Sequence, residues 1–116
     1  MTPTVYVVQN PHCRQGERLV PKFNLAPAER YGPLKFLLSP NAAPWRTEDV
    51  MAELRAKLSG FTSEDYLLLI GNPVLIGLAT AVAADAAGRV QFLQWNGTAQ
   101  GYLAVEATVF DEETED

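Results

Sequence analysis

Cysteine and histidine each occur only once in the 116-residue chain, as Cys13 and His12. A single cysteine excludes a disulfide within the chain and a zinc site built on several thiolates. A single histidine excludes every site that needs two imidazoles. The glycine-rich fingerprints of phosphate-binding loops, G-x-G-x-x-G and G-x-x-x-x-G-K-[ST], are also missing. The sequence thus carries no catalytic motif, and we expect no catalytic residues, no metal and no cofactor.

Basic residues are fewer than acidic ones, and the two kinds are unevenly distributed. The formal net charge is −5, yet residues 1–46 hold six basic and only two acidic side chains. Residues 111–116 hold five carboxylates, a run typical of a solvated end; the alternative is a tail that docks on a basic partner or screens the basic N-terminal half. We expect one domain over residues 1–110 and an acidic tail over residues 111–116. A pI of 4.8 argues against a nucleic-acid-binding protein.

Uncharged segments long enough to span a membrane are scarce, and residues 66–84 are the one candidate, with 19 residues. Gly71-Asn72-Pro73 interrupts this segment with a turn and a helix start, where a spanning helix would be continuous. We therefore predict a strand followed by a helix and no membrane association, with an inserted helix as the alternative. No N-terminal stretch has the pattern of a signal peptide, so we expect a cytoplasmic protein.

Apolar runs and their periods predict five strands and two helices. The strands are expected at residues 4–9, 34–38, 66–70, 90–95 and 102–110. The helices are expected at residues 47–59 and 73–87, with Thr47 and Asn72 as N-caps and Gly88 closing the second helix. Alternation of strand, helix and strand favours parallel pairing, and the last two strands form an antiparallel hairpin. We predict an α/β fold with a single domain and a mixed, mostly parallel sheet of about five strands. Residues 5–8, 67–70 and 90–93 should be central in it.

The second predicted helix carries a stripe of small residues, Gly77, Ala81, Ala84 and Gly88. Small side chains allow close approach, so we expect Gly77 and Ala81 to face the sheet or another helix. On that expectation Gly77→Leu would overpack the contact and cost about 1–3 kcal/mol. Asp85, the only charge of this helix, is expected at its exposed end.

A long stretch without a clear period, residues 10–33, separates the first two predicted strands. Prolines at positions 11, 21, 27 and 33 exclude a continuous helix or a central strand there. A short helical turn fits residues 25–31, because a proline suits the first turn of a helix. Irregular stretches of this length are often functional. We interpret this stretch and its arginines as a binding segment.

Candidate site residues follow two strands that end at the same edge of the predicted sheet, where ligands bind in parallel α/β folds. If those strands are neighbours, Asn10, His12, Cys13 and Asn72 converge, and Arg14 and Arg18 reach the same place. They would form a site for a small anion or nucleotide. Adjacent side chains such as His12 and Cys13 rarely reach one another, so we interpret them as a loop histidine and a half-buried thiol. Trp45 and Trp95 are interpreted as packing residues.

Three sequence blocks resemble a group of short, uncharacterised proteins encoded by tailed bacteriophages. These blocks are VYVVQ at residues 5–9, YGPLKFLLSP at residues 31–40, and a stretch over residues 65–90 that opens with DYLLLIGNP. The group has a similar opening strand, a Y-G-x-L strand and a D-Y-L-L-L-I-G-[DN]-P block in this order. The resemblance covers most of residues 4–95 and implies a phage protein in a bacterial cytoplasm. It implies no catalytic residue.

The sequence favours a binding protein over an enzyme. The first hypothesis is a phage accessory protein that binds a host or phage protein without catalysis, through residues 10–33. The alternative is a nucleotide- or anion-binding α/β domain with its site at the C-terminal edge of the sheet. A nucleic-acid partner is disfavoured by the near-neutral body and the acidic tail.

Overall fold

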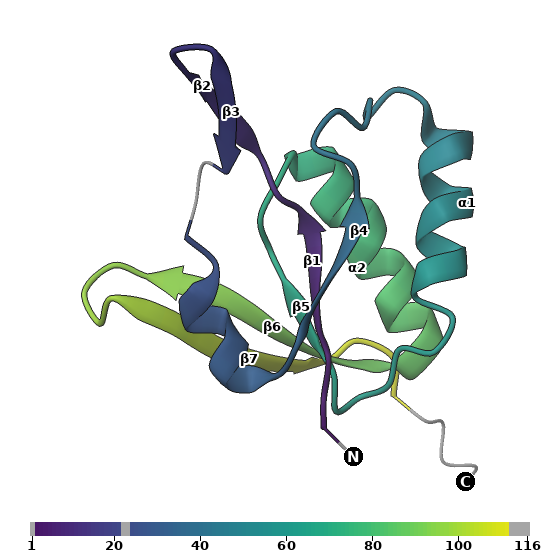
Figure 1. Cartoon of the computed structure of the whole chain (residues 1–116). Coiled ribbons are helices and arrows are strands. Elements are labelled where there is room, and N and C mark those ends of the chain that lie inside the picture. Colours follow the sequence, from purple (N-terminus) through teal and green to yellow (C-terminus); the bar gives the residue numbers. More distant parts are fainter. Residues whose placement is uncertain (1, 22–23, 112–116) are drawn as a thin grey trace, which may run out of the picture.

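The computed structural model describes residues 2–21 and 24–111, and Figure 1 shows how their elements are arranged. The strands are β1 (Val5–Gln9), β2 (His12–Gln15), β3 (Arg18–Pro21), β4 (Leu34–Leu38), β5 (Tyr66–Leu68), β6 (Arg89–Asn96) and β7 (Gly101–Thr108). The helices are the 3-10 helix η1 (Ala26–Tyr31) and the α-helices α1 (Thr47–Lys57) and α2 (Pro73–Ala87). Residues 112–116 of the expected acidic tail lie outside the described residues.

Five strands form the main sheet, in the order β4-β1-β5-β6-β7. The first four are parallel, and β7 returns antiparallel to β6 with Phe92 opposite Val105. β5 lies in the middle with β1 and β6 beside it, as the buried apolar runs predicted. The predicted fold class, a mixed and mostly parallel α/β sheet with a C-terminal hairpin, is confirmed.

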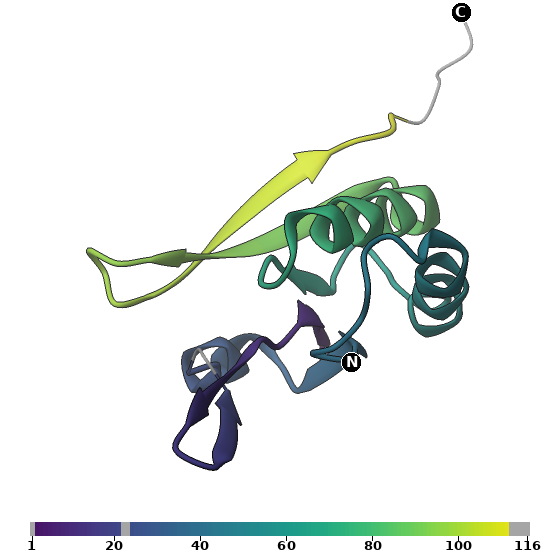
Figure 2. The same ribbon diagram turned by 90° about the horizontal axis from the view of Figure 1, so that it is seen from above.

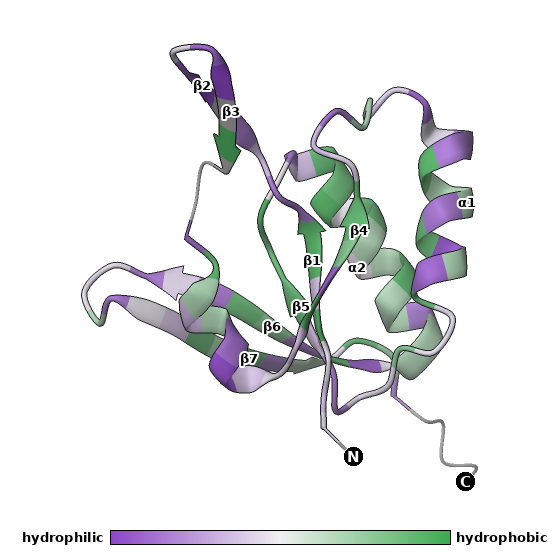
Figure 3. Ribbon diagram, viewed as in Figure 1, coloured by the Kyte–Doolittle hydropathy of each residue, from purple (hydrophilic) through white to green (hydrophobic). Residues whose placement is uncertain are grey.

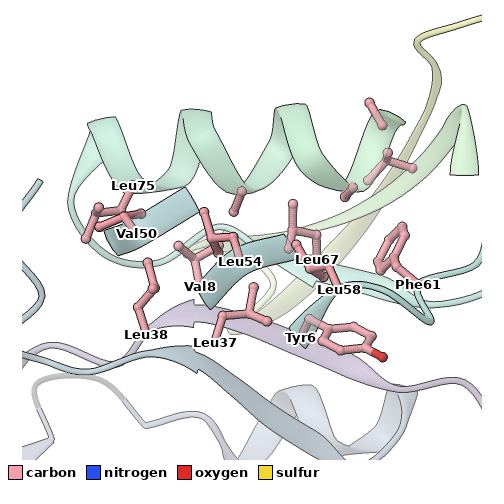
Figure 4. Packing of buried hydrophobic residues seen from close by; sticks show 14 residues of the cluster. Tyr6, Val8, Leu37, Leu38, Val50, Leu54, Leu58, Phe61, Leu67 and Leu75 are labelled. Atoms are coloured by element: carbon pink, nitrogen blue, oxygen red, sulfur yellow. The ribbon is translucent and has the colours of Figure 1, made fainter. Parts of the chain in front are cut away.

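Both long helices cover the same face of the sheet, and the larger hydrophobic core lies between them and the strands (Figures 2 and 4). Strand side chains alternate between faces. Tyr6 and Val8 of β1 therefore belong to this core, while Val5 and Val7 point to the opposite face. Figure 3 shows hydrophilic residues along the exposed side of α1 and hydrophobic residues on β1 and much of α2.

A smaller core on the opposite face is covered by η1 (Figure 1). Leu25 and Ala28 of this segment are buried against the sheet. The rings of Tyr31 and Tyr66 lie 5.1 Å apart, and the Tyr31 hydroxyl donates to the Tyr102 carbonyl oxygen at 2.9 Å. The helical turn predicted for residues 25–31 is therefore present, and its function is to bury this face.

Residues 10–33 are less irregular than the sequence suggested. Besides η1, they contain the antiparallel hairpin β2–β3, which forms a separate two-stranded sheet. The hairpin projects away from the main sheet in Figure 1, beyond the end of β1. Its polar and apolar residues do not alternate as they do in a half-buried strand, so periodicity could not reveal it.

The ends of the helices agree with the predicted caps at two positions and differ at one. The Asn72 side chain accepts from the Val74 backbone N–H at 2.9 Å, and α2 ends before Gly88. Thr47 does not cap α1. Arg46 occupies the cap position without a side-chain hydrogen bond, and Thr47 is the first helical residue.

The small-residue stripe of α2 faces away from the core, so the predicted close contact is wrong. Gly77 and Ala81 are exposed, and a Cβ atom added at Gly77 would meet nothing within 4 Å. Leu75, Ala79 and Ala83 form the buried row instead. Positions two residues apart lie on opposite sides of an α-helix, so a stripe at 77 and 81 points away when 75 and 79 point inward. Ala84, at the border of the stripe, is buried, and Asp85 is exposed as expected.

Gly77→Ala is therefore expected to raise the free energy of unfolding by about 0.5–1 kcal/mol, because alanine is the best helix former and glycine among the poorest. Ala81→Gly, at an equally exposed position, should lower it by a similar amount. Urea unfolding of both variants measures the effect. Destabilisation by Gly77→Ala would indicate a close neighbour at that position.

The segment considered as a membrane span is a strand, a turn and a helix, as predicted, because β5 ends at Leu68 and α2 begins at Pro73. Among the described residues, no helix combines the length and the apolar character needed to cross a bilayer.

The interpretation of Trp45 as a packing residue is wrong, since 79% of its surface is exposed.

Candidate functional site

The loops that follow β1, β4 and β5 are tied together by one buried side chain, that of Gln9 (6% exposed). Its Oε1 accepts from the Asn72 backbone N–H at 2.9 Å. Its Nε2 donates to the carbonyl oxygens of Ser39 and Pro40 at 3.1 and 3.3 Å. All three hydrogen bonds of this amide are to backbone groups, so Gln9 fixes the relative positions of the three loops.

Gly71 lets the chain pass directly over Gln9. Its φ of +127° lies in a region that side-chain-bearing residues rarely adopt. A Cβ atom at this position would lie 2.6 Å from the Gln9 Cβ and 2.9 Å from its Oε1. The turn between β5 and α2 therefore requires glycine at position 71 so that its backbone can pack directly against Gln9.

A pocket of about 610 Å³ opens at this edge on the side of the sheet opposite α1 and α2. Its wall is formed by the end of the β5 segment, by β6 and β7, and by the chain on either side of the hairpin. The lining residues are Pro11, Asn24, Leu69, Ile70, Gly71, Trp95 and Tyr102. None of them carries a formal charge at neutral pH, and most of the wall is apolar. Its volume lies in the range of pockets that bind small ligands.

Two aromatic rings from the final hairpin form one wall of the pocket. Trp95 and Tyr102 meet edge to face with their centroids 5.2 Å apart. The Tyr102 carbonyl is held by the Tyr31 hydroxyl, and its own hydroxyl points to the Asn24 carbonyl at 3.5 Å. Burial raises the pKa of the Tyr102 hydroxyl above its ordinary value. Trp95 remains 48% exposed, so about half of this side chain is accessible to a partner.

The predicted anion site at the start of α2 has few free donors. The Asn72 N–H is bonded to Gln9, and the Asn72 side chain occupies the Val74 N–H. Pro73 has no N–H, and the Ile76 N–H already closes the first helical turn on the Asn72 carbonyl. Anions at helix starts are held by free backbone N–H groups, so this edge is poorly equipped for one.

The other predicted site residues lie on or next to the hairpin. Asn10 precedes β2, and its carbonyl oxygen lies 2.8 Å from the His12 Nδ1. Asn10 Oδ1 is buried, with no hydrogen-bond partner among residues 2–21 and 24–111. His12 is exposed. Cys13 pairs with Val20 across the hairpin, but its side chain lies outside the described part of the structure, so its half-buried thiol stays a prediction.

Arg14 and Arg18 are exposed near the tip of the hairpin. Arg14 lies opposite Leu19, and Arg18 lies opposite Gln15. Within the described ranges neither arginine forms an ion pair. The strand before the hairpin does neighbour β5, as the convergence hypothesis requires. The arginines, however, belong to the β2–β3 hairpin, which projects past the edge of the main sheet (Figure 1).

The described part of the chain contains no cluster of side chains suited to binding a metal ion. Among residues 2–21 and 24–111, no three His, Cys, Asp or Glu side chains gather closely enough to hold an ion.

Sequence reasoning missed Gln9 and the aromatic wall of the pocket. The one signal for Gln9 was a polar residue at the end of an otherwise apolar, buried strand. Trp95 and Tyr102 come together only through the pairing of β6 with β7, which places them opposite one another.

The fold and its edge define a small α/β domain with a projecting basic hairpin beside an apolar pocket. Residues 3–109 match the model of the family described as Phage Pam3 gp32-like protein. The chain belongs to this family, which confirms the resemblance to phage-encoded proteins. A search of the curated proteins and a search of the solved structures each give no match.

Proposed function

We propose that this phage protein is an accessory protein that binds a host or phage protein without catalysis, in the cytoplasm of the infected bacterium. The observation that carries the proposal is the juxtaposition of two recognition elements at one end of the molecule. These are the exposed arginines of the β2–β3 hairpin and the open apolar pocket lined by Trp95 and Tyr102.

The residue types of this end suit protein recognition. Arginine, tryptophan and tyrosine are the residues most enriched among those that dominate binding energy at protein interfaces. The pocket offers burial to an apolar side chain, and Arg14 and Arg18 offer charge-assisted hydrogen bonds to carboxylates. The partner that fits best is an acidic surface with a protruding apolar or aromatic side chain.

Arg14→Ala/Arg18→Ala is expected to abolish capture of the partner from phage-infected cells while leaving the melting temperature nearly unchanged. Both side chains are exposed, and exposed substitutions usually change stability by less than about 0.5 kcal/mol. Affinity purification with quantitative mass spectrometry measures the capture. The control variant Arg46→Ala/Arg55→Ala removes the same amount of charge from the α1 side of the molecule. It should still capture the partner. Equal capture by both double variants would contradict the hairpin as the binding element.

A nucleotide- or anion-binding domain is the second candidate, and the position of the pocket at the C-terminal edge of the strands favours it. The occupied donors around Asn72 count against it. A thermal-shift screen with phosphate and nucleotides separates the two functions. A ligand at a hundred times its dissociation constant stabilises the folded state by about 2.7 kcal/mol. Such a shift, lost in Asn72→Ala, would make this second function the better one.

A further inference from the structure

Among residues 2–21 and 24–111, no strand pairs with the outer edge of β7. β7 is the last strand of the sheet and is eight residues long. Figure 2 shows it at the margin of the molecule with no described element beyond it. The opposite edge strand, β4, has five residues and carries the exposed Lys35, with Pro33 directly before it. Short length, lysine and proline are features that protect an edge from pairing, and β7 has none of them.

Apolar side chains are exposed along β7 and just after it. Leu103 is 51% exposed and Val105 is 41% exposed, and Val109 and Phe110 are exposed as well. α2 packs mainly over β1 and β6 and leaves these side chains of the last strand exposed. The unpaired backbone edge and this apolar strip therefore lie side by side.

β7 carries little charge, so electrostatic repulsion does not oppose the approach of a second, identical strand. Its only charged residue is Glu106, whose Oε2 lies 2.7 Å from the Arg89 Nη2 across the β6–β7 pair. Two copies of this strand can therefore approach without uncompensated repulsion, provided that the two glutamates are not placed opposite one another.

We infer that β7 pairs with β7 of a second copy of this chain, antiparallel about a two-fold axis at Val105. In this register Val105 faces its own copy, Leu103 faces Ala107, and Glu106 faces Ala104. Opposed residues point to the same side of an antiparallel sheet, so the exposed apolar strips of the two copies merge. A two-fold axis one residue further along would oppose Glu106 to its own copy. An isologous pairing of this kind closes as a dimer and joins the two sheets into one.

Sedimentation equilibrium of the full chain tests the inference, with a concentration-dependent dimer expected. Val105→Lys places two ammonium groups at the axis and should raise the dimer dissociation constant by about a hundredfold. Phe36→Lys changes an equally exposed residue on β4 and should leave the dimer intact. Circular dichroism of both variants confirms that they are folded. A wild-type chain that stays monomeric at every concentration would overturn the inference and leave this edge to a strand of another protein.

A cross-link tests the register. Val105→Cys in a Cys13→Ser background should give a covalent dimer on mild oxidation, because the introduced thiols face one another across the axis. Thr108→Cys in the same background lies three residues from the axis and should not. Cross-linking of Thr108→Cys with none from Val105→Cys would overturn the proposed pairing.

Discussion

Asp65→Ala is expected to lower the free energy of unfolding by about 2–4 kcal/mol. The Asp65 carboxylate is buried where β5 begins. Its Oδ1 accepts from the Thr4 backbone N–H at 2.9 Å, and its Oδ2 accepts from the Thr62 N–H and Oγ1 at 2.9 and 3.1 Å. Alanine would leave two backbone N–H groups without an acceptor and would release the turn before β5 from the start of β1.

Urea unfolding measures this effect, and Asp85→Ala is the matched control. Asp85 is exposed at the end of α2, so its removal should change stability by less than about 0.5 kcal/mol. Asp65→Asn keeps one acceptor oxygen and should fall between the two. Equal stability of Asp65→Ala and Asp85→Ala would contradict the role of this carboxylate as a clamp.

Gly32→Ala is expected to destabilise the fold by about 2–4 kcal/mol, because strain and a steric clash add at one position. The φ of Gly32 is +150°, and a Cβ atom there would clash with the Pro3 carbonyl oxygen. The clash is with backbone that leads into β1, so no side-chain rotation can relieve it. η1 and β4 would have to shift relative to β1.

Gly60→Ala provides the control for this substitution. Gly60 has no positive φ, and an added Cβ atom would meet nothing within 4 Å. Thermal unfolding of the two variants should show a large drop in melting temperature for Gly32→Ala and almost none for Gly60→Ala. Similar curves would contradict the requirement for glycine at position 32.

The sequence blocks that carry the family resemblance are explained by folding requirements. Gly32 allows close passage over Pro3, and the ring of Tyr31 packs at a tilt against that of Tyr66. Asp65 clamps two segments, and Gly71 closes the edge over Gln9. These residues build the sheet and its edge, so the shared blocks predict the fold well and the function poorly.

Strands and helices could be predicted because each buries an apolar pattern of its own. The 66–70 run and the capped start of α2 at Asn72 and Pro73 are clear examples. The β2–β3 hairpin could not be predicted, because its polar and apolar residues do not alternate as they do in a half-buried strand. The orientation of α2 was also out of reach. The helix is apolar nearly all round, and composition alone does not say whether Gly77 or Ala79 faces the sheet.

The candidate site was only partly accessible from sequence. The edge of the sheet was predicted correctly as the place where the β1 and β5 loops meet. Gln9 bridges those loops through contacts with residues 30 to 63 positions away along the chain. The pocket depends on Trp95 and Tyr102 meeting a segment near Pro11. Such long-range contacts leave no periodic trace in the sequence.

The most direct test of recognition through the hairpin is a calorimetric titration of the captured partner against three proteins. These are the wild type, Arg14→Ala/Arg18→Ala and Arg46→Ala/Arg55→Ala. We predict at least about a tenfold loss of affinity for the hairpin variant, none for the control, and weaker wild-type binding as salt rises. Full affinity of the hairpin variant, together with loss of binding in Asn72→Ala, would contradict this account and move the site to the start of α2.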